Sequence, residues 1–173
     1  MKRIFLSVTI LLMLFTALLV ACSINNDGNG TTLQVRLTDN PIIADEVNVD
    51  IRDVRVRFRD DSTDWISLDT HVGVYNLLGL QKGVDTLLAV GVIPTNILKE
   101  IRLVLGTDNT IKVNGQVYPL TIPSGAESGL KIKVDKKLNR NLETLLIDFD
   151  AELSIHQTGN GTYMLKPVLR LKD

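Results

Sequence analysis

The chain contains few of the residues from which catalytic and metal centres are usually built. Its 173 residues include one cysteine, Cys22, which excludes an intrachain disulfide. The only histidines are His71 and His156, and zinc sites typically need three or four cysteine or histidine ligands. We therefore expect no histidine-based metal centre. A Ser-His-Asp set is not indicated either, because Ser124 in PSGAESG lacks the G-x-S-x-G pattern of a nucleophile elbow.

Aromatic residues are also scarce, and the chain has no excess of positive charge. Aromatic side chains make up 5% of the chain, and the single tryptophan, Trp65, opens a short predicted strand after a charged loop. Sugar-binding surfaces usually present an exposed aromatic ring, whereas we interpret Trp65 as a core residue. The 19 basic and 20 acidic side chains give no electrostatic footprint for nucleic acid, so we expect no nucleic-acid partner.

The N-terminal segment is typical of a secretory signal. Lys2 and Arg3 precede an apolar run at 4–21 that only three hydroxyl residues interrupt. A charged start followed by an apolar run is the pattern of a signal peptide, although a run of this length could also span a bilayer. The sequence LVAC at 19–22 resembles the bacterial lipobox. This resemblance implies cleavage before Cys22, a diacylglyceryl group on its sulfur and an acylated amino group.

Lipid attachment would divide the chain into three parts. These are a signal peptide at 1–21, a flexible tether at 22–32 and one domain at 33–173. Each buried methylene contributes roughly 0.8 kcal/mol to membrane binding, so two or three acyl chains hold a protein firmly. Ser23 is not the aspartate associated with inner-membrane retention, which favours the outer membrane. The alternative is an uncleaved transmembrane helix in which the cysteine stands by chance.

From residue 33 onward, apolar residues alternate with polar ones. Leu33, Val35 and Leu37 follow this pattern, and the segments 101–105 and 130–134 repeat it. Alternation over a few residues is typical of a half-buried strand, whereas the strands of parallel sheets are apolar throughout. The sequence therefore predicts short antiparallel strands.

The segment VNVDIRDVRVRF at 47–58 contains a change of phase. Its apolar residues are at odd positions up to 51 and at even positions from 54. One extra residue must be absorbed between them, or half of the strand would turn its apolar side chains outward. We predict a β-bulge at Arg52 and Asp53. A strand that crosses from one sheet of a sandwich to the other is the alternative.

Turn signals separate the predicted strands, and helix signals are few. Asn114-Gly115 is a dipeptide that type I′ hairpins favour, and residues 106–109 predict a less specific hairpin before it. Pro167 removes a backbone donor from the last predicted strand, which indicates an edge or a bulge. The helix candidates, 75–80 and 95–99, are short. The sequence thus predicts an all-β fold, a two-layer antiparallel β-sandwich with at most one or two short helices.

Ordered motifs cover nearly all of the chain after residue 32. They are LQVRLTDNP at 33–41, VNVDIRDVRV at 47–56, WISL at 65–68, NLLGL at 76–80, EIRLVLG at 100–106, PSGAESGLKI at 123–132, LIDFDAELSI at 146–155 and LKPVLRL at 165–171. This series resembles a bacterial lipoprotein family, the domain of unknown function 4382. The resemblance implies a secreted, usually lipid-anchored β-sandwich near transthyretin-like or immunoglobulin-like sandwiches, and it implies no reaction.

Three acidic side chains alternate along LIDFDAELSI. Asp148, Asp150 and Glu152 would project from one face of a regular strand, and their oxygens could contribute to a Ca²⁺ site, which needs six to eight oxygen ligands. No D-x-D-x-D-G loop supplies the remaining ligands. We favour the alternative, a solvated polar face that Arg or Lys on adjacent strands neutralise. We expect no other cofactor.

Arginines at 52, 55, 57 and 59 lie close to Asp50 and Asp53 in a second charged segment. Cross-strand pairs of opposite charge, each contributing roughly 0.2–1 kcal/mol, account for such a segment. A basic ligand-binding stripe is the alternative.

The sequence as a whole favours a non-catalytic protein of the cell envelope. We expect a lipid-anchored binding or structural domain, held in the membrane through Cys22, with a protein or a glycan as its partner. The alternatives are an envelope hydrolase whose site the sequence does not reveal and a Ca²⁺-stabilised subunit of a surface assembly.

Overall fold

The structure, a computed structural model, describes residues 30–58, 64–94, 96–123, 129–138 and 141–172. The predicted signal peptide, Cys22 and most of the predicted tether lie outside these residues. The described elements are β1 (Gly30–Asp39), β2 (Glu46–Arg57), β3 (Ile66–Ser67), β4 (Asp69–Thr70), β5 (Gly73–Asn76), η1 (Leu77–Leu80), β6 (Thr86–Pro94), β7 (Ile97–Leu105), β8 (Thr110–Val113), β9 (Gln116–Thr121), β10 (Leu130–Lys137), β11 (Leu142–Phe149), α2 (Ala151–Ser154), β12 (Ile155–Gln157), β13 (Tyr163–Leu165) and β14 (Leu169–Lys172).

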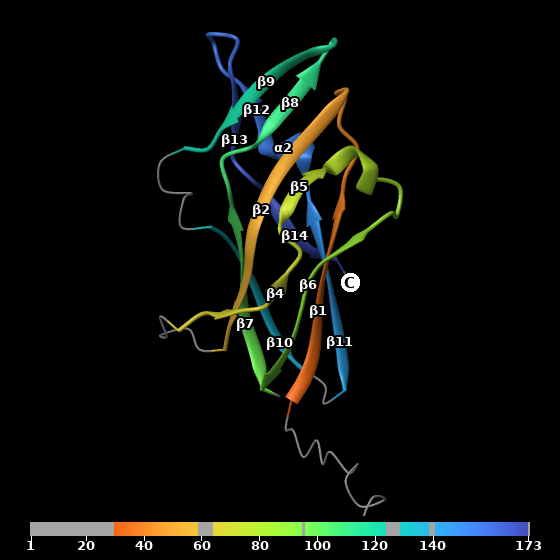
Figure 1. Cartoon of the computed structure of the whole chain (residues 1–173), viewed down its shortest axis with the longest axis vertical. Helices are drawn as coiled ribbons and strands as arrows, with labels where there is room; N and C mark the ends of the chain where they lie inside the picture. Colours follow the sequence, from red (N-terminus) through yellow and green to blue (C-terminus); the bar gives the residue numbers. More distant parts are fainter. Residues whose placement is uncertain (1–29, 59–63, 95, 124–128, 139–140, 173) are drawn as a thin grey trace, which may run out of the picture.

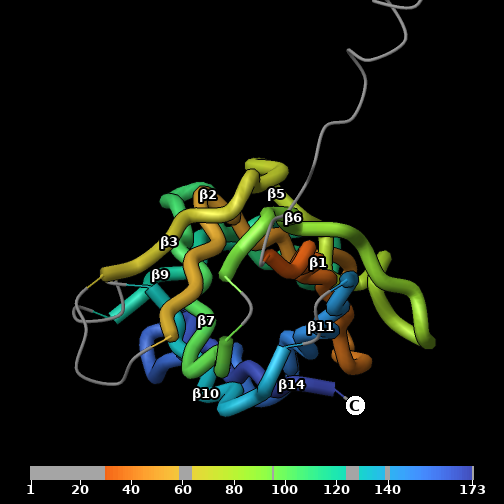
Figure 2. Tube along the Cα trace, turned by 90° about the horizontal axis from the view of Figure 1, so that it is seen from below, coloured from red at the N-terminus to blue at the C-terminus, as the bar shows by residue number. Residues whose placement is uncertain are grey.

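The strands of the described residues form two packed sheets (Figure 1). One sheet has the strand order β14-β11-β1-β6-β4. The other has the order β10-β7-β2-β8-β9-β13-β12, and β3 and β5 also pair with β2. Seen along the long axis, the sheets face each other, and the edge strands β10 and β14 approach on one side (Figure 2). The prediction of an all-β, two-layer sandwich is confirmed.

The core lies between the two sheets and follows the predicted alternation. Leu33, Val35 and Leu37 of β1 are fully buried, as are Ile101 and Leu103 of β7 in the opposite sheet. Burial of such a side chain contributes roughly 1.5–3 kcal/mol. No helix in the described part of the chain is long and apolar enough to cross a membrane.

The predicted bulge in β2 is confirmed. The register between β2 and β7 shifts between Ile51 and Asp53, and Arg52 is the exposed residue at that point. Val54 is therefore fully buried, on the same side as Ile51. β2 remains in one sheet along its whole length, so the alternative of a strand that crosses between sheets is wrong.

The direction of pairing differs from the prediction in two places. β1 pairs with β11 in parallel, and β9 pairs with β13 in parallel, whereas all strands were expected to be antiparallel. Alternation indicates which side of a strand is buried, and a strand that follows a long connection can pair in either direction. Residues 30–32, assigned to the tether, belong to β1, and Thr31 is fully buried.

One of the two predicted turns is confirmed and the other is wrong. Asn114 and Gly115, with φ of 52° and 78°, join β8 to β9 as predicted. A further turn at residues 158–162 joins β12 to β13. Residues 106–109 close no hairpin, because β7 and β8 both pair with β2. Pro167 lies between β13 and β14, where the predicted last strand is broken.

The short helices are also only partly as predicted. The candidate at 75–80 is a 3₁₀ helix over Leu77–Leu80, which the Asn76 side chain caps by accepting from the Leu78 N–H. The candidate at 95–99 is wrong, because β7 begins at Ile97. Pairing with β2 and β10 overrides the local helix signal there.

Candidate functional site: a buried carboxylate cluster

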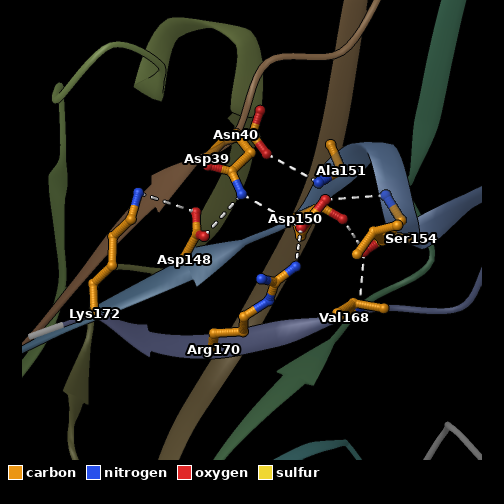
Figure 3. Close-up of polar contacts among 10 residues, drawn as sticks. Asp39, Asn40, Asp148, Asp150, Ala151, Ser154, Val168, Arg170 and Lys172 are labelled. Carbon is orange, nitrogen blue, oxygen red and sulfur yellow. Dashed lines mark hydrogen bonds and ion pairs between the residues drawn. The ribbon is translucent and has the colours of Figure 1, made fainter.

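Three carboxylates meet where the parallel strands β1 and β11 end side by side (Figure 3). Asp39 ends β1, Asp148 lies near the end of β11, and Asp150 follows that strand directly. Because the carboxyl ends of parallel strands lie at one edge of a sheet, these residues come together although they are over 100 positions apart in the chain. All three are at most 4% exposed. We call them the carboxylate cluster.

Donors and cations from neighbouring segments contact two members of the carboxylate cluster, although Asp148 Oδ1 accepts no hydrogen bond from the described residues. The Asn40 Nδ2 donates to Asp148 Oδ2 at 3.0 Å and to Asp150 Oδ2 at 3.3 Å. Lys172 Nζ lies 3.6 Å from Asp148 Oδ1, and the Arg170 guanidinium pairs with Asp150 Oδ2. Both cations come from β14. Buried charges need such partners, since an unpaired ion would cost several kcal/mol.

Asp150 also holds α2 in place. Its Oδ1 accepts from the Leu153 N–H at 3.0 Å, which caps the helix, and its backbone oxygen accepts from the Ser154 hydroxyl. The same hydroxyl oxygen accepts from the Val168 N–H at 2.8 Å. The cluster therefore ties together the end of β11, the helix and the chain on its way to β14 (Figure 3).

The premise of the predicted Ca²⁺ face is wrong. β11 ends at Phe149, so Asp148, Asp150 and Glu152 do not share a strand face, and Glu152 lies exposed on α2. Aspartate is a favoured N-cap residue, and Asp150 caps the helix α2 instead of continuing the strand β11. Neutralisation by Arg and Lys of an adjacent strand is confirmed, although the carboxylates are buried rather than solvated. The described residues contain no group of three or more His, Cys, Asp or Glu placed to hold a metal ion.

Asp39 differs from the other two members because its hydrogen bonds come from neutral groups. Its Oδ1 accepts from the Ala151 N–H at 3.1 Å, and its Oδ2 accepts from Gln81 Nε2 at 3.2 Å. Burial raises the pKa of Asp39 from 3.8 to about 6, and the nearby Asp148 adds to the increase, while the two hydrogen bonds oppose it. The carboxyl group of Asp39 therefore changes its charge at about pH 6.

The titration of Asp39 predicts a pH dependence of stability. The folded state holds the Asp39 proton more tightly than the unfolded chain does, so this group stabilises the fold most below about pH 4. Its contribution falls as the pH rises through about 6, by up to about 3 kcal/mol. Asp39→Asn keeps an acceptor for Ala151 and removes the titration. Urea unfolding between pH 4.5 and 7.5 should therefore show a flatter pH dependence in this variant.

The control for this prediction is Asp69→Asn. Asp69 is an exposed carboxylate of β4, so its replacement should leave the pH dependence of the wild type in place. An Asp39→Asn variant whose stability changes with pH as steeply as that of the wild type would show that Asp39 does not titrate in this range.

The other candidate residues that the structure describes are the two histidines. His71 lies between β4 of the smaller sheet and β5, which pairs with β2 of the larger sheet, and His156 lies in β12 of the larger sheet; both are exposed. Ser124 and Cys22 lie outside the described residues.

A second buried carboxylate, which the sequence analysis missed, lies in β2. Asp50 is fully buried, and Arg52 Nε lies 2.8 Å from its Oδ1. The Asp50 backbone oxygen accepts from the Gly106 N–H at 2.8 Å, and its N–H donates to Asn109 Oδ1 at 2.9 Å. The segment 106–109 thus continues the ladder of β7 along β2. No pattern in the sequence indicates this burial, because Asp50 occupies a polar, outward position in the alternation of residues 47–51.

An open pocket of about 500 Å³ lies beside this loop. Its walls are mostly apolar and combine residues 105–107 and Asn109 with residues 119–122 at the end of β9. The charged groups of Asp50 and Arg52 are paired with each other and do not line the pocket. The pocket therefore offers an apolar contact surface rather than a reactive group.

Comparison with known proteins gives one match. A family model described as "Domain of unknown function (DUF4382)" matches residues 30–167, from the first residue of β1 to the proline before β14. No curated protein and no solved structure matches the chain.

Proposed function

The chain belongs to the family described as domain of unknown function DUF4382, and from this premise we propose that it is a lipid-anchored, non-catalytic binding or structural domain of the cell envelope. The observation that carries the proposal is the sequence LVAC at 19–22, placed eight residues before the first strand at Gly30. A signal of this kind supports acylation of Cys22. The partner class we propose is a protein or a glycan.

The arrangement of the strands suits a domain that presents one end to a partner. β1 begins at one end of the sandwich, and the β8–β9 hairpin lies at the opposite end (Figure 1). An anchor ahead of β1 would keep the first end near the bilayer and turn the hairpins away from it. Ser23 supports delivery to the outer membrane.

The buried polar groups support a structural role over a catalytic one. In the carboxylate cluster, Asp150 pairs with Arg170 and caps α2, and Asp148 lies within ion-pair distance of Lys172, so both carboxylates serve to join segments of the fold. Asp39 has both of its carboxylate oxygens occupied. No observation on the described residues favours the hydrolase or the Ca²⁺-stabilised subunit.

Cys22→Ala tests the anchor directly. Because two or three acyl chains fix a protein to a membrane and none can form without the thiol, the variant should leave the membrane fraction or remain as an unprocessed precursor. Cell fractionation followed by mass spectrometry of the N-terminal peptide measures both outcomes.

The matched control is Ser23→Ala, which changes the neighbouring residue and leaves the thiol. It should be acylated and partition like the wild type. A Cys22→Ala protein that is still processed and still sediments with membranes would disprove the anchor.

A further inference from the structure

Basic side chains stand in register across three strands of the larger sheet. Lys131 of β10 lies opposite Arg102 of β7, and Arg102 lies opposite Arg55 of β2. In the next row, Lys133 and Arg57 flank Glu100. The residues that alternate with them, Ile101, Leu103, Val54 and Val56, are fully buried, so the row points away from the core. We call the five basic residues the basic face: Arg55, Arg57, Arg102, Lys131 and Lys133.

Arg102 lies at the centre of the basic face and is poorly compensated. Its guanidinium carbon is 4.0 Å from the centroid of the Trp65 ring, a cation–π contact that Arg57 shares at 5.1 Å. Its Nε is buried and has no hydrogen-bond partner among the described residues. Burial, together with the charges of Arg55 and Arg57, lowers the pKa of Arg102. Like charges directly opposite each other destabilise a sheet, so the unliganded face carries an electrostatic cost.

The carboxylates of this face are already paired. Arg55 Nε lies 2.5 Å from Asp53 Oδ2, which also accepts from the Ser67 hydroxyl. The second pair joins Arg57 and Glu100, with NH2 and Oε2 2.7 Å apart. Within the described part of the chain, no carboxylate forms an ion pair with Arg102, Lys131 or Lys133. The face therefore has a local positive excess in a chain whose formal charge is −1.

We propose that the basic face binds a linear acidic polysaccharide through the carboxylate groups of its sugars. The proposal deepens the proposed function and rests on it for the location in the envelope. Neighbouring strands are about 4.8 Å apart, so the row Lys131, Arg102 and Arg55 presents cations at intervals close to the length of one sugar unit. The guanidinium fork matches a carboxylate with two parallel hydrogen bonds, and a bound anion between Arg55 and Arg102 removes their repulsion.

The position of the basic face favours a soluble polymer over the membrane surface. β2, β7 and β10 run along the long axis of the domain, in the sheet that does not contain β1 (Figure 1). A bilayer that holds the chain ahead of β1 meets the end of the sandwich, whereas the basic face lies on its side. Trp65, interpreted from the sequence as a core residue, is half-buried beside this face, and the guanidinium groups of Arg57 and Arg102 lie over its ring.

Binding of polygalacturonate to the full-length lipidated protein, purified in a non-ionic detergent, tests the proposal. Calorimetry should show binding that weakens as the salt concentration rises, and none to neutral dextran. Arg102→Gln and the double variant Lys131→Gln/Lys133→Gln should each weaken binding about tenfold or more, since each removes charge-assisted hydrogen bonds. Both lysines are exposed, so the double variant should melt like the wild type. The control is Lys166→Gln, an exposed lysine elsewhere, which should bind like the wild type.

Three results would overturn the proposal. These are equal binding of dextran and polygalacturonate, unchanged binding by the folded double variant, and no binding of polygalacturonate at all. A last measurement tests binding to vesicles of phosphatidylglycerol. Binding to these vesicles without binding to polygalacturonate would assign the basic face to lipid headgroups instead. Cell fractionation of the Cys22→Ala variant tests the lipid anchor separately. An error in the proposed location can therefore be distinguished from an error in the proposed ligand.

Discussion

Val54→Asp is expected to lower the free energy of unfolding by about 4 kcal/mol or more. Val54 is fully buried in the half of β2 that follows the bulge, where it faces the core with Val56. A carboxylate at this position would lose its water and gain no cation, and a buried unpaired charge costs several kcal/mol. Urea or thermal unfolding of the purified variant measures this loss of stability. If the loss exceeds the stability of the domain, the variant will not accumulate in cells.

Arg55→Ala is the matched control, one residue along the same strand. Arg55 points to the opposite side, and its ion pair with Asp53 is partly exposed, so removal should cost less than about 1 kcal/mol. Equal losses of stability in the two variants would contradict the inward phase that the bulge sets for this half of β2.

Gly106→Ala is expected to destabilise the domain by about 3 to 5 kcal/mol. A Cβ atom at residue 106 would lie 2.0 Å from Asp50 Oδ2 and 2.6 Å from Arg52 Nε, which is far inside van der Waals contact. Asp50 is fully buried and cannot swing into solvent. Either the loop moves and the Gly106 N–H loses the Asp50 oxygen, or the carboxylate leaves Arg52 and remains a buried charge without a partner.

Gly73→Ala is the control for this second variant. Gly73 pairs with Ile51, next to Asp50 in β2, but an added Cβ would meet nothing within 4 Å. The free energy of unfolding should therefore change by no more than about 0.5 kcal/mol. A Gly106→Ala protein as stable as Gly73→Ala would show that the loop can move away from Asp50 at little cost.

The features that could be predicted from the sequence are those that short-range alternation determines. The inward phase of β1 follows from Leu33, Val35 and Leu37, and the bulge follows from the change of phase around Arg52. The turn at Asn114-Gly115 was equally local, because its two residues tolerate positive φ. Each of these signals lies within about a dozen residues of chain, and no partner strand has to be known.

The features that could not be predicted depend on which segments become neighbours. Nothing in LIDFDAELSI shows that Asp150 will contact Asn40 and Arg170, which come from distant segments of the chain, while its other oxygen caps α2. The basic face is a similar case, since Lys131, Arg102 and Arg55 become a row only through the register of three strands. The segment 50–59 was interpreted as cross-strand ion pairs, and this is confirmed for Arg57 and Glu100, whereas Arg55 pairs with Asp53 of its own strand.

The parallel pairing of β1 with β11 also has a consequence for when the domain can fold. β1 is an inner strand of its sheet, and one of its two neighbours is completed only at Phe149. Non-local pairings of this kind raise the contact order and slow the search for the native state. We therefore expect the polypeptide to remain without its final structure until nearly all of it, including the residues up to Phe149, has been synthesised.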